Sequence, residues 1–360
     1  MRFLIIGQTP PPYGGQTINI EKIVILLKKH DFDFRFVRLD FSAELSETGK
    51  LSFIKIWRLL RIFCSICYYL IVYRPKYVYY PVAGPNKVPV IRDIILLLPV
   101  RLFQKKLIFH FHAGGLSEIY PKLGSLLKKL YKIAYFAPYH SICMSNYGKR
   151  DPQFLQSKAI SIIPYGVPDN SVNLQGNAKE VFNVLFVAVC RESKGILDFI
   201  KIIRSAKARL PKITGTVMGE TGPGKELDLI NQAVAEGLIT YKGVRVGQAK
   251  YEVFRQADAF LFPTFFEAEN FPTVNLEAFS FGLPVVSTTW RGVNDQVQNA
   301  VNGFIHQVHD IDGMAGSVLK LATDRELYTQ LTENARRCYQ ENYTAALFDQ
   351  RILDLFNQFK

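Results

Sequence analysis

The sequence alternates short, mostly apolar runs with longer amphipathic segments along almost its whole length. The apolar runs of the first half are residues 3–7, 34–39, 77–81, 107–112, 141–144 and 159–164. Runs of this length are typical of buried strands in a parallel sheet, and the segments between them are long enough for crossover helices. The helices expected there are residues 17–29, 52–73, 88–103 and 120–136. The alternation predicts an α/β fold with a doubly wound parallel sheet.

The second half repeats this alternation after a polar stretch at residues 168–181 that contains Gly and Asn. Its apolar runs are residues 182–189, 213–218, 259–262 and 283–287, with a last strand near 303. Three helices are expected at about 311–323, 325–341 and 344–358. A chain of 360 residues has room for two domains. The sequence therefore predicts one domain at 1–170 and a second that begins at 171.

Residues 260–289 combine a strand, a polar loop, a helix and a further strand. Pro272 suits the first helical position, and Gly282 suits the helix end. Glu269 precedes the expected helix N-terminus, where free N–H groups attract anions such as a diphosphate. Glu277 lies within the helix among apolar residues and needs a hydrogen-bonding partner, for which a ribose diol would serve.

Other polar or glycine-rich positions follow directly after expected strands. Arg191 and Lys194 follow the strand at 182–189, where a forked donor and a point charge suit a diphosphate. Gly14 and Gly15 form a strand-to-helix turn that lets backbone approach a ligand closely, although a tight turn alone is the alternative.

Two histidines end the strand at 107–112 and point to the same side of it. His112 lies at the carboxyl end, where ligands bind in open parallel sheets, and we interpret His110 as structural. A third metal ligand is not evident near this pair.

The five cysteines are odd in number and mostly in apolar settings, which is typical of reduced core residues in a cytoplasmic protein. The opening residues are too short for a secretory signal.

The motif E-x7-E from Glu269 to Glu277, followed by A-x-x-x-G-x-P-V-V, resembles the retaining glycosyltransferases of the family usually numbered four. Phe271, Pro272 and Leu276 match the family string as well, whereas Asn270 replaces its usual glycine. The resemblance implies the GT-B architecture, in which two Rossmann-like domains face each other across a cleft. It also implies a second domain at 171–343 and a C-terminal helix, 344–360, that returns to the first domain.

The resemblance further implies roles for individual residues. Glu269 and His112 would be catalytic, with Glu269 stabilising the sugar or an oxocarbenium-like transition state, and configuration would be retained. Gly14 and Gly15 would line the cleft beside the donor phosphate and the acceptor. The donor-binding residues would be Arg191, Lys194, Gly219, Val244, Asn270, Phe271, Pro272, Thr273 and Glu277. We expect no cofactor and no metal, because cations are available to meet the diphosphate and no DxD motif is present.

The net positive charge of the chain lies entirely in its first half. Residues 1–170 contain 24 Lys and Arg against 10 Asp and Glu, whereas residues 171–360 contain 20 against 21. The basic, partly apolar segment that carries Lys55, Trp57, Arg58 and Arg61 is expected to contact an anionic membrane surface. The uncharged run at 62–73 is too short to span a bilayer. A motif for nucleic acid does not accompany the charge.

These observations predict a hexosyltransferase that moves a sugar from a UDP or GDP donor to a hydroxyl acceptor. The acceptor would be a saccharide or a lipid-linked saccharide of bacterial surface polysaccharide synthesis. The enzyme would be cytoplasmic and peripherally bound to the inner face of the plasma membrane. A non-catalytic sugar-nucleotide-binding or scaffold subunit of a membrane assembly is the alternative, and the intact set of Glu269, Glu277, Arg191 and Lys194 argues against it.

Overall fold

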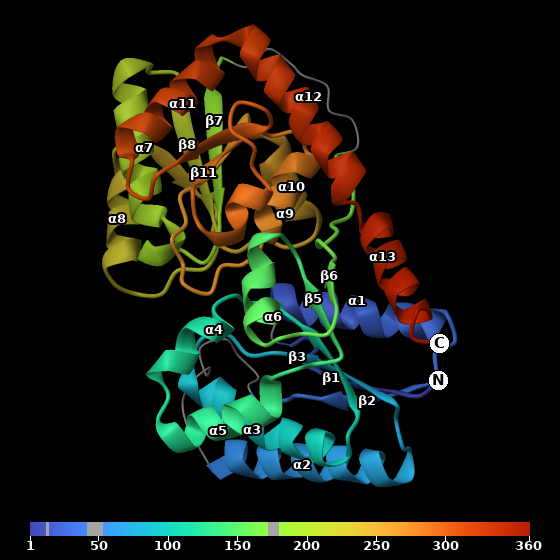
Figure 1. The fold of residues 1–360 in the computed structure, drawn as a ribbon. Coiled ribbons are helices and arrows are strands. Elements are labelled where there is room, and N and C mark those ends of the chain that lie inside the picture. The colour runs from blue at the N-terminus through green and yellow to red at the C-terminus, as the bar shows by residue number, and fades with distance from the viewer. Residues whose placement is uncertain (12–13, 42–52, 172–179) are drawn as a thin grey trace. The chain divides into compact units, whose positions relative to one another are not determined.

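Two six-stranded parallel sheets, each covered by helices, organise the chain in the computed structural model (Figure 1). The structure describes residues 1–11, 14–41, 53–171 and 180–360. One compact unit comprises Met1–Tyr165 with Phe348–Lys360, and the other comprises Gly166–Leu347. The predicted fold class of two Rossmann-like, doubly wound units is confirmed.

The sheet of the first unit has the order β2-β1-β3-β4-β5-β6. Its strands are β1 (Phe3–Gly7), β2 (Phe34–Arg38), β3 (Tyr77–Pro81), β4 (Lys106–His110), β5 (His140–Cys143) and β6 (Ile160–Ile162). Its helices are α1 (Gly15–Lys29), α2 (Phe53–Val72), α3 (Lys87–Leu102), α4 (Leu116–Ile119), α5 (Ser125–Tyr135) and α6 (Arg150–Phe154). The strand expected at 107–112 therefore ends at His110, two residues earlier than predicted.

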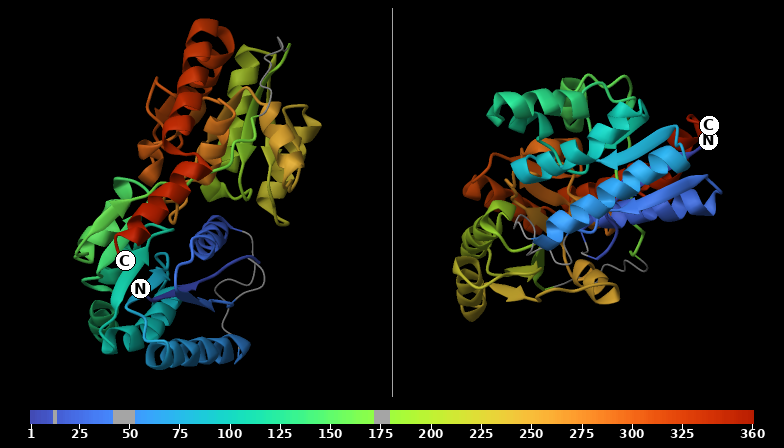
Figure 2. Two further views of the ribbon diagram at one scale, coloured as in Figure 1. Left: turned by 90° about the vertical axis from the view of Figure 1, so that its right-hand side faces the viewer. Right: turned by 90° about the horizontal axis from the view of Figure 1, so that it is seen from below.

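Alternate residues of these strands pack on opposite faces of the sheet, as the two-residue period of a strand requires. Leu4, Val78 and Phe109 belong to a core shared with helices α2, α3 and α5. Those three helices lie next to one another on that face, and the view from below in Figure 2 shows α2 beside α3. On the other face, the rings of Phe3 and Tyr77 stack with centroids 5.3 Å apart.

The C-terminal helix α13 (Ala345–Asn357) completes this second face of the first unit. The ring of Phe356 lies 5.4 Å from the ring of Phe3 and 6.1 Å from that of Phe32, between centroids. Phe356 is fully buried, and Phe359 stacks on Tyr77 with centroids 5.2 Å apart. Aromatic contacts of this kind explain why the end of the chain belongs to the unit that contains its beginning.

The sheet of the second unit has the order β12-β11-β10-β7-β8-β9. Its strands are β7 (Phe182–Val187), β8 (Ile213–Met218), β9 (Ile239–Tyr241), β10 (Ala259–Phe262), β11 (Val285–Thr288) and β12 (Gly303–His306). Its helices are α7 (Ile196–Arg209), α8 (Lys225–Ala235), α9 (Gln248–Arg255), α10 (Thr273–Ser280), α11 (Ile311–Thr323) and α12 (Arg325–Asn342). The order reverses direction between β7 and β10, which makes this pair the topological switch point of the sheet.

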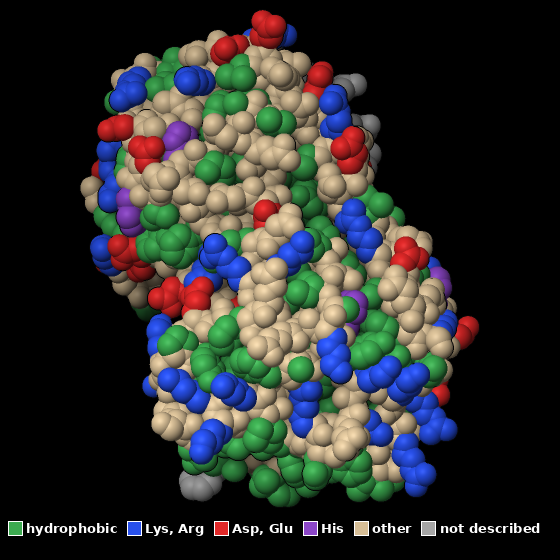
Figure 3. Space-filling view, in the orientation of Figure 1, with side chains coloured by type: hydrophobic (Ala, Val, Ile, Leu, Met, Phe, Trp, Pro, Cys, Tyr) green, Lys and Arg blue, Asp and Glu red, His purple; other side chains and the backbone are tan. Residues whose placement is uncertain are grey.

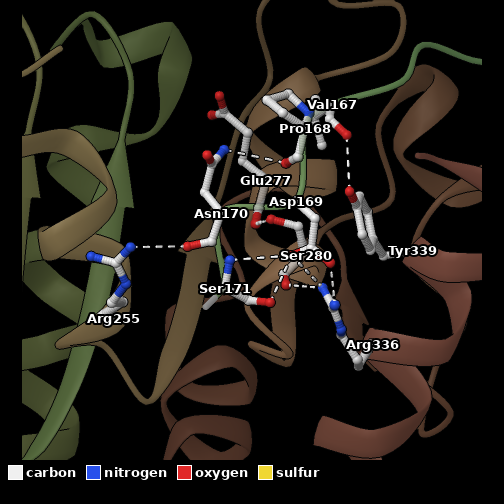
Figure 4. A network of polar contacts seen from close by, with 10 residues as sticks. All are labelled: Val167, Pro168, Asp169, Asn170, Ser171, Arg255, Glu277, Ser280, Arg336 and Tyr339. Carbon is white, nitrogen blue, oxygen red and sulfur yellow. Dashed lines mark hydrogen bonds and ion pairs between the residues drawn. The ribbon is translucent and has the colours of Figure 1, made fainter. Parts of the chain in front are cut away.

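The first unit ends at Tyr165, whereas we expected the boundary after residue 170. The reason is visible in Figure 4, where the segment from Val167 to Ser171 is bound by side chains of the second unit. The Tyr339 hydroxyl donates to the carbonyl of Val167 at 2.9 Å, and Arg336 pairs with the Asp169 carboxylate. Of the polar stretch predicted at 168–181, residues 172–179 lie outside the described part of the chain.

Candidate functional site

The loops that follow β7 and β10 meet at the carboxyl edge of the second sheet, at its switch point. The main chain of Phe265 donates to the carbonyl of Ser193 at 2.9 Å. Gly195 adopts φ +90°, and a Cβ atom there would lie 2.2 Å from the carbonyl oxygen of Pro263. Only glycine allows this close approach of the two loops. Ligand-binding crevices of open parallel sheets form at such a point.

Lys194 and Glu269, which the sequence singled out separately, are in direct contact. The Lys194 Nζ lies 2.6 Å from Glu269 Oε2, and the two side chains are only 21% and 11% exposed. The ammonium group also lies 4.2 Å from the centroid of the Phe266 ring, in reach of a cation–π interaction. A cation and a carboxylate thus share a mostly dry position at the switch point. Arg191, by contrast, is exposed.

Side chains at and after the end of β11 hold the loop that carries Glu269. The Ser287 hydroxyl donates to the carbonyl of Phe262 at 2.5 Å, and the Thr288 hydroxyl donates to the carbonyl of Thr264. The indole N–H of Trp290 donates to the carbonyl of Phe266 at 2.9 Å. These three side chains therefore bind the carbonyls of every second residue from the end of β10 to Phe266. These three side chains were not predicted as part of the site, although polar residues directly after an apolar run were an available signal.

The residues between Glu269 and α10 are largely buried. Asn270 is 2% exposed, and Phe271 is 5% exposed with its ring edge-on to Tyr343. Pro272 is the N-cap of α10 and Thr273 the first helical residue, which shifts the predicted helix start by one position. The Pro272 carbonyl accepts from the amide of Gln296 at 3.1 Å. The side chain of Phe271 therefore packs in the core, and the main chain is what this segment offers to a ligand.

Glu277 also has a lysine partner. The Lys250 Nζ in the first turn of α9 lies 2.6 Å from Glu277 Oε1, with the two side chains 24% and 20% exposed. The other carboxylate oxygen, Oε2, is buried and has no hydrogen-bond partner within the described residues. The sequence identified Glu277 but missed Lys250, since nothing local connects two positions 27 residues apart.

Two further predicted donor-site residues lie at the ends of β8 and β9. Gly219 adopts φ +151°, and a Cβ atom there would lie 1.7 Å from the carbonyl oxygen of Ala188. The Tyr241 hydroxyl donates to the Gly219 carbonyl at 2.9 Å. Val244 lies in the loop after β9 and is 58% exposed. These positions border the same carboxyl edge of the sheet as Lys194.

In the first unit, His110 and His112 stack with ring centroids 4.0 Å apart. The Tyr79 hydroxyl contacts His110 Nδ1 at 2.7 Å, and the Tyr165 hydroxyl contacts His112 Nδ1. Burial lowers the pKa of His110 to about 3. Burial, together with the neighbouring His110, lowers the pKa of His112 well below its usual range. Both imidazoles are therefore neutral at pH 7, and both Nε2 atoms lack a hydrogen-bond partner within the described residues.

The glycine pair after β1 stands at the start of α1. Gly14 is the N-cap, with an extended φ of −158°, and the Thr17 hydroxyl bonds to its main chain. A Cβ atom added to Gly15 would meet nothing within 4 Å. Packing within the described residues therefore does not require glycine at Gly15, and its main chain is open to approach.

Helix α2 presents an exposed apolar surface to solvent. Trp57 is 69% exposed and Leu60 is 52% exposed. Arg58 donates to the carbonyl of Phe41, and Arg61 pairs with Asp40, so these two cations are directed toward the chain that precedes α2. In Figure 3, Lys and Arg side chains are spread over the first unit, with apolar side chains gathered at its lower edge. No described helix combines the length and apolarity needed to cross a bilayer.

A metal site does not emerge from the described ranges, because no three His, Cys, Asp or Glu side chains there are arranged to hold an ion. All five cysteines lie in the described part of the chain, and none of them forms a disulfide there. Burial raises the pKa of the Cys190 thiol, next to Arg191, to about 12, which disfavours the reactive thiolate. The candidate positions thus offer amino, carboxylate and main-chain groups in the second unit and imidazole groups in the first.

Comparison with known proteins finds similarity that lies mainly in the second unit. Residues 171–338 match the family model of glycosyl transferases group 1. The capsular polysaccharide biosynthesis glycosyltransferase CapM of Staphylococcus aureus is 27% identical over 106 residues, which cover 29% of this chain and 27% of CapM. The chain thus matches only about a quarter of the length of that relative.

Solved structures share the fold over the whole chain. The sucrose-phosphate synthase of Thermosynechococcus elongatus is similar with a TM-score of 0.74 at 16% identity, covering 99% of this chain and 98% of that one. Anabaena Alr3699/HepE, solved in complex with UDP and glucose, is similar with a TM-score of 0.68 at 16% identity, covering 99% of both chains. At this identity the likeness establishes the two-unit GT-B fold alone.

Proposed function

We propose that this chain is a retaining glycosyltransferase that moves a sugar from a nucleoside diphosphate to a hydroxyl acceptor. The observation that carries the proposal is the contact between Lys194 and Glu269 at the switch point of the second sheet. In such a transfer a cation stabilises the negative charge that develops on the leaving group, and a nearby carboxylate stabilises the positive charge that develops on the sugar carbon. The match of residues 171–338 to glycosyl transferases group 1 supports the same assignment.

The nucleoside diphosphate is the group that leaves, and its developing negative charge must be stabilised. Lys194 would turn from Glu269 to the diphosphate, with Arg191 approaching from the exposed side of the same loop. The N-terminus of α10, which begins at Thr273, adds main-chain N–H groups. Cations and oriented N–H groups of this kind accelerate reactions by electrostatic stabilisation.

The sugar would face Glu269 once Lys194 has moved to the phosphates. The carboxylate would stabilise positive charge on the sugar ring in the transition state. His112 is neutral, and its free Nε2 could hydrogen-bond a sugar hydroxyl. Retention of configuration rests on the resemblance of the motif from Glu269 to Glu277.

The acceptor would be a saccharide carried on a lipid at an anionic membrane surface. The exposed Trp57 and Leu60 of α2 are suited to the bilayer interface, and Lys55 is the nearby cation. Arg58 and Arg61 would contribute charge while remaining bound to the chain before α2. The name of CapM, a capsular polysaccharide biosynthesis glycosyltransferase, is consistent with such an acceptor. The enzyme would act on the cytoplasmic side, with UDP or GDP as the carrier.

The transfer reaction is tested by incubating the protein with UDP-sugars and GDP-sugars and an acceptor extract, with nucleoside diphosphate release as the readout. Glu269→Ala should lower kcat by about 10²–10³ and leave nucleotide binding largely intact. Glu267→Ala is the matched control, because Glu267 is an exposed carboxylate on the same loop. Anomeric analysis of the product by NMR reports retention. Near-normal turnover by Glu269→Ala would end the catalytic assignment.

Membrane association has its own test. Trp57→Ser combined with Leu60→Ser should release the protein from anionic vesicles and suppress transfer to a lipid-linked acceptor. Transfer to a short soluble analogue should persist, because the proposed donor residues belong to the other unit. Val234→Ser, at an exposed apolar position of α8, is the control. Equal loss of activity on both acceptors would contradict the membrane proposal.

A further inference from the structure

The two carboxylate oxygens of Glu277 have different surroundings. Oε1 accepts from the Lys250 ammonium group at 2.6 Å, whereas Oε2 is buried without a hydrogen-bond partner within the described part of the chain. A buried carboxylate oxygen without a donor is unfavourable, because burial removes its hydrogen bonds to water and no protein donor replaces them. The free oxygen therefore marks a place where a ligand can donate one hydrogen bond.

The charge of Lys250 restricts which ligand group fits there. Glu277 is already neutralised by an ammonium group at 2.6 Å, so a second cation would add uncompensated positive charge. A neutral donor, such as a hydroxyl group, satisfies Oε2 without changing the net charge. A phosphate or another anion would be repelled by the carboxylate.

The position of Glu277 is fixed independently of Lys250. The Ser280 hydroxyl donates to the main-chain carbonyl of Glu277 at 2.7 Å, and Arg336 donates to the main-chain carbonyl of Ser280. Arg336 also pairs with Asp169, as Figure 4 shows. The backbone at Glu277 is therefore anchored, and Lys250 is the described contact that selects the orientation of the carboxylate.

We propose that Lys250 is a positioning residue that holds Glu277 so that Oε2 alone accepts a single hydroxyl of the donor ribose. This inference rests on the proposed function, which places the donor diphosphate at the N-terminus of α10, the helix that carries Glu277. It goes further by assigning Lys250 and by limiting the recognition to one of the two ribose hydroxyls. A carboxylate with both oxygens free could accept both hydroxyls, whereas here Oε1 is already engaged by Lys250.

Titration calorimetry tests the proposal with UDP or GDP, whichever the wild-type protein binds more tightly, and with its 2′-deoxy and 3′-deoxy analogues. The wild type should bind one deoxy analogue about tenfold to a hundredfold more weakly than the ribonucleotide, and the other with similar affinity. Lys250→Met should weaken ribonucleotide binding and reduce that preference to within about twofold. Lys250→Arg should restore the preference, because its guanidinium can bond the same oxygen. Lys320→Met, at an exposed site on α11, should change nothing.

The outcomes separate this inference from the proposed function. Wild-type binding of the nucleotide with an unchanged preference in Lys250→Met overturns the role of Lys250 and leaves the proposed function standing. Equal discrimination by the wild type against both analogues overturns the single-hydroxyl reading. If the wild type binds neither UDP nor GDP, the proposed function fails, and this inference fails with it.

Discussion

Replacing Lys194 by methionine should affect both stability and ligand binding, and the structure separates the two effects. Methionine keeps a flexible, unbranched side chain and removes the ammonium group. Glu269 then loses the partner that lies 2.6 Å from its Oε2, while its side chain remains only 11% exposed. A carboxylate left unpaired in such a position is expected to destabilise the second unit.

The size of the effect follows from the burial of the pair. Removing one partner of a fully buried ion pair typically destabilises a protein by about 3–5 kcal/mol. The Lys194 and Glu269 side chains retain 21% and 11% exposure, so water can partly solvate the remaining carboxylate. We expect about 2 kcal/mol, which corresponds to about 4–8 °C in the melting temperature of a domain of this size.

A second variant distinguishes an unpaired charge from poor packing. Lys194→Met combined with Glu269→Gln removes the orphan charge and should recover most of the lost stability. Its binding of UDP or GDP should stay as weak as that of the single variant, by about tenfold or more, because the cation for the diphosphate is still missing. Differential scanning calorimetry and titration calorimetry on the same samples provide both readouts.

The control is a lysine in an exposed pair of the same region. Lys225 lies 3.8 Å from Glu192, with the two side chains 66% and 59% exposed. Lys225→Met should change the free energy of unfolding by less than about 0.5 kcal/mol. The reasoning is refuted if Lys194→Met melts with the wild type, or if the double variant is no more stable than the single one. Unchanged nucleotide affinity in Lys194→Met would show that the lysine serves the fold alone.

Three further substitutions have defined outcomes. Tyr165→Phe leaves Nδ1 of the buried, neutral His112 without its hydroxyl partner and should lower the free energy of unfolding in urea by about 1–3 kcal/mol; an unchanged midpoint contradicts this. Hydrogen bonding from Arg336 lowers the pKa of Asp169 to about 2, so Asp169→Asn should be less stable than the wild type at pH 6. The difference in free energy of unfolding should be below about 1 kcal/mol, because the Asp169 side chain is half-exposed. It should shrink as the pH falls from 4 toward 2 and the carboxylate is protonated. A difference that stays constant with pH would exclude the ion pair as its cause. Trp290→Phe frees the loop carbonyl that the indole binds and should lower kcat more than donor affinity, whereas equal effects would argue against a positioning role.

The secondary structure could be predicted because it depends on local periodicity. The apolar run at 182–189 corresponds to β7, Phe182–Val187, and the helix expected at 311–323 is α11. Burial on both faces of a parallel strand leaves a continuous apolar run that can be recognised without any partner. The same argument explains the small errors at element ends, such as the end of β4 at His110, where hydrogen bonding and not hydrophobicity decides the last residue.

The partners of the charged residues could not be predicted, because they depend on sheet order. Lys194 and Glu269 are 75 residues apart and meet only because β7 and β10 are neighbours. The contact of Arg61 with Asp40 spans 21 residues and changes how the basic helix α2 is interpreted. A pattern of residue types shows that a cation is present, but the topology determines which anion it meets.

The two carboxylates of the motif differ in how their lysine partners can respond to a donor. Glu269 and Glu277 each have an ammonium group at 2.6 Å. On the proposed function, a diphosphate brings more negative charge than one carboxylate, so moving Lys194 from Glu269 to the phosphates is electrostatically favourable and leaves Glu269 charged beside the sugar. The ribose is neutral, so Lys250 gains nothing by leaving Glu277. One lysine therefore exchanges partners and the other stays, which predicts that the salt dependence of nucleotide affinity should decrease in Lys194→Met and persist in Lys250→Met.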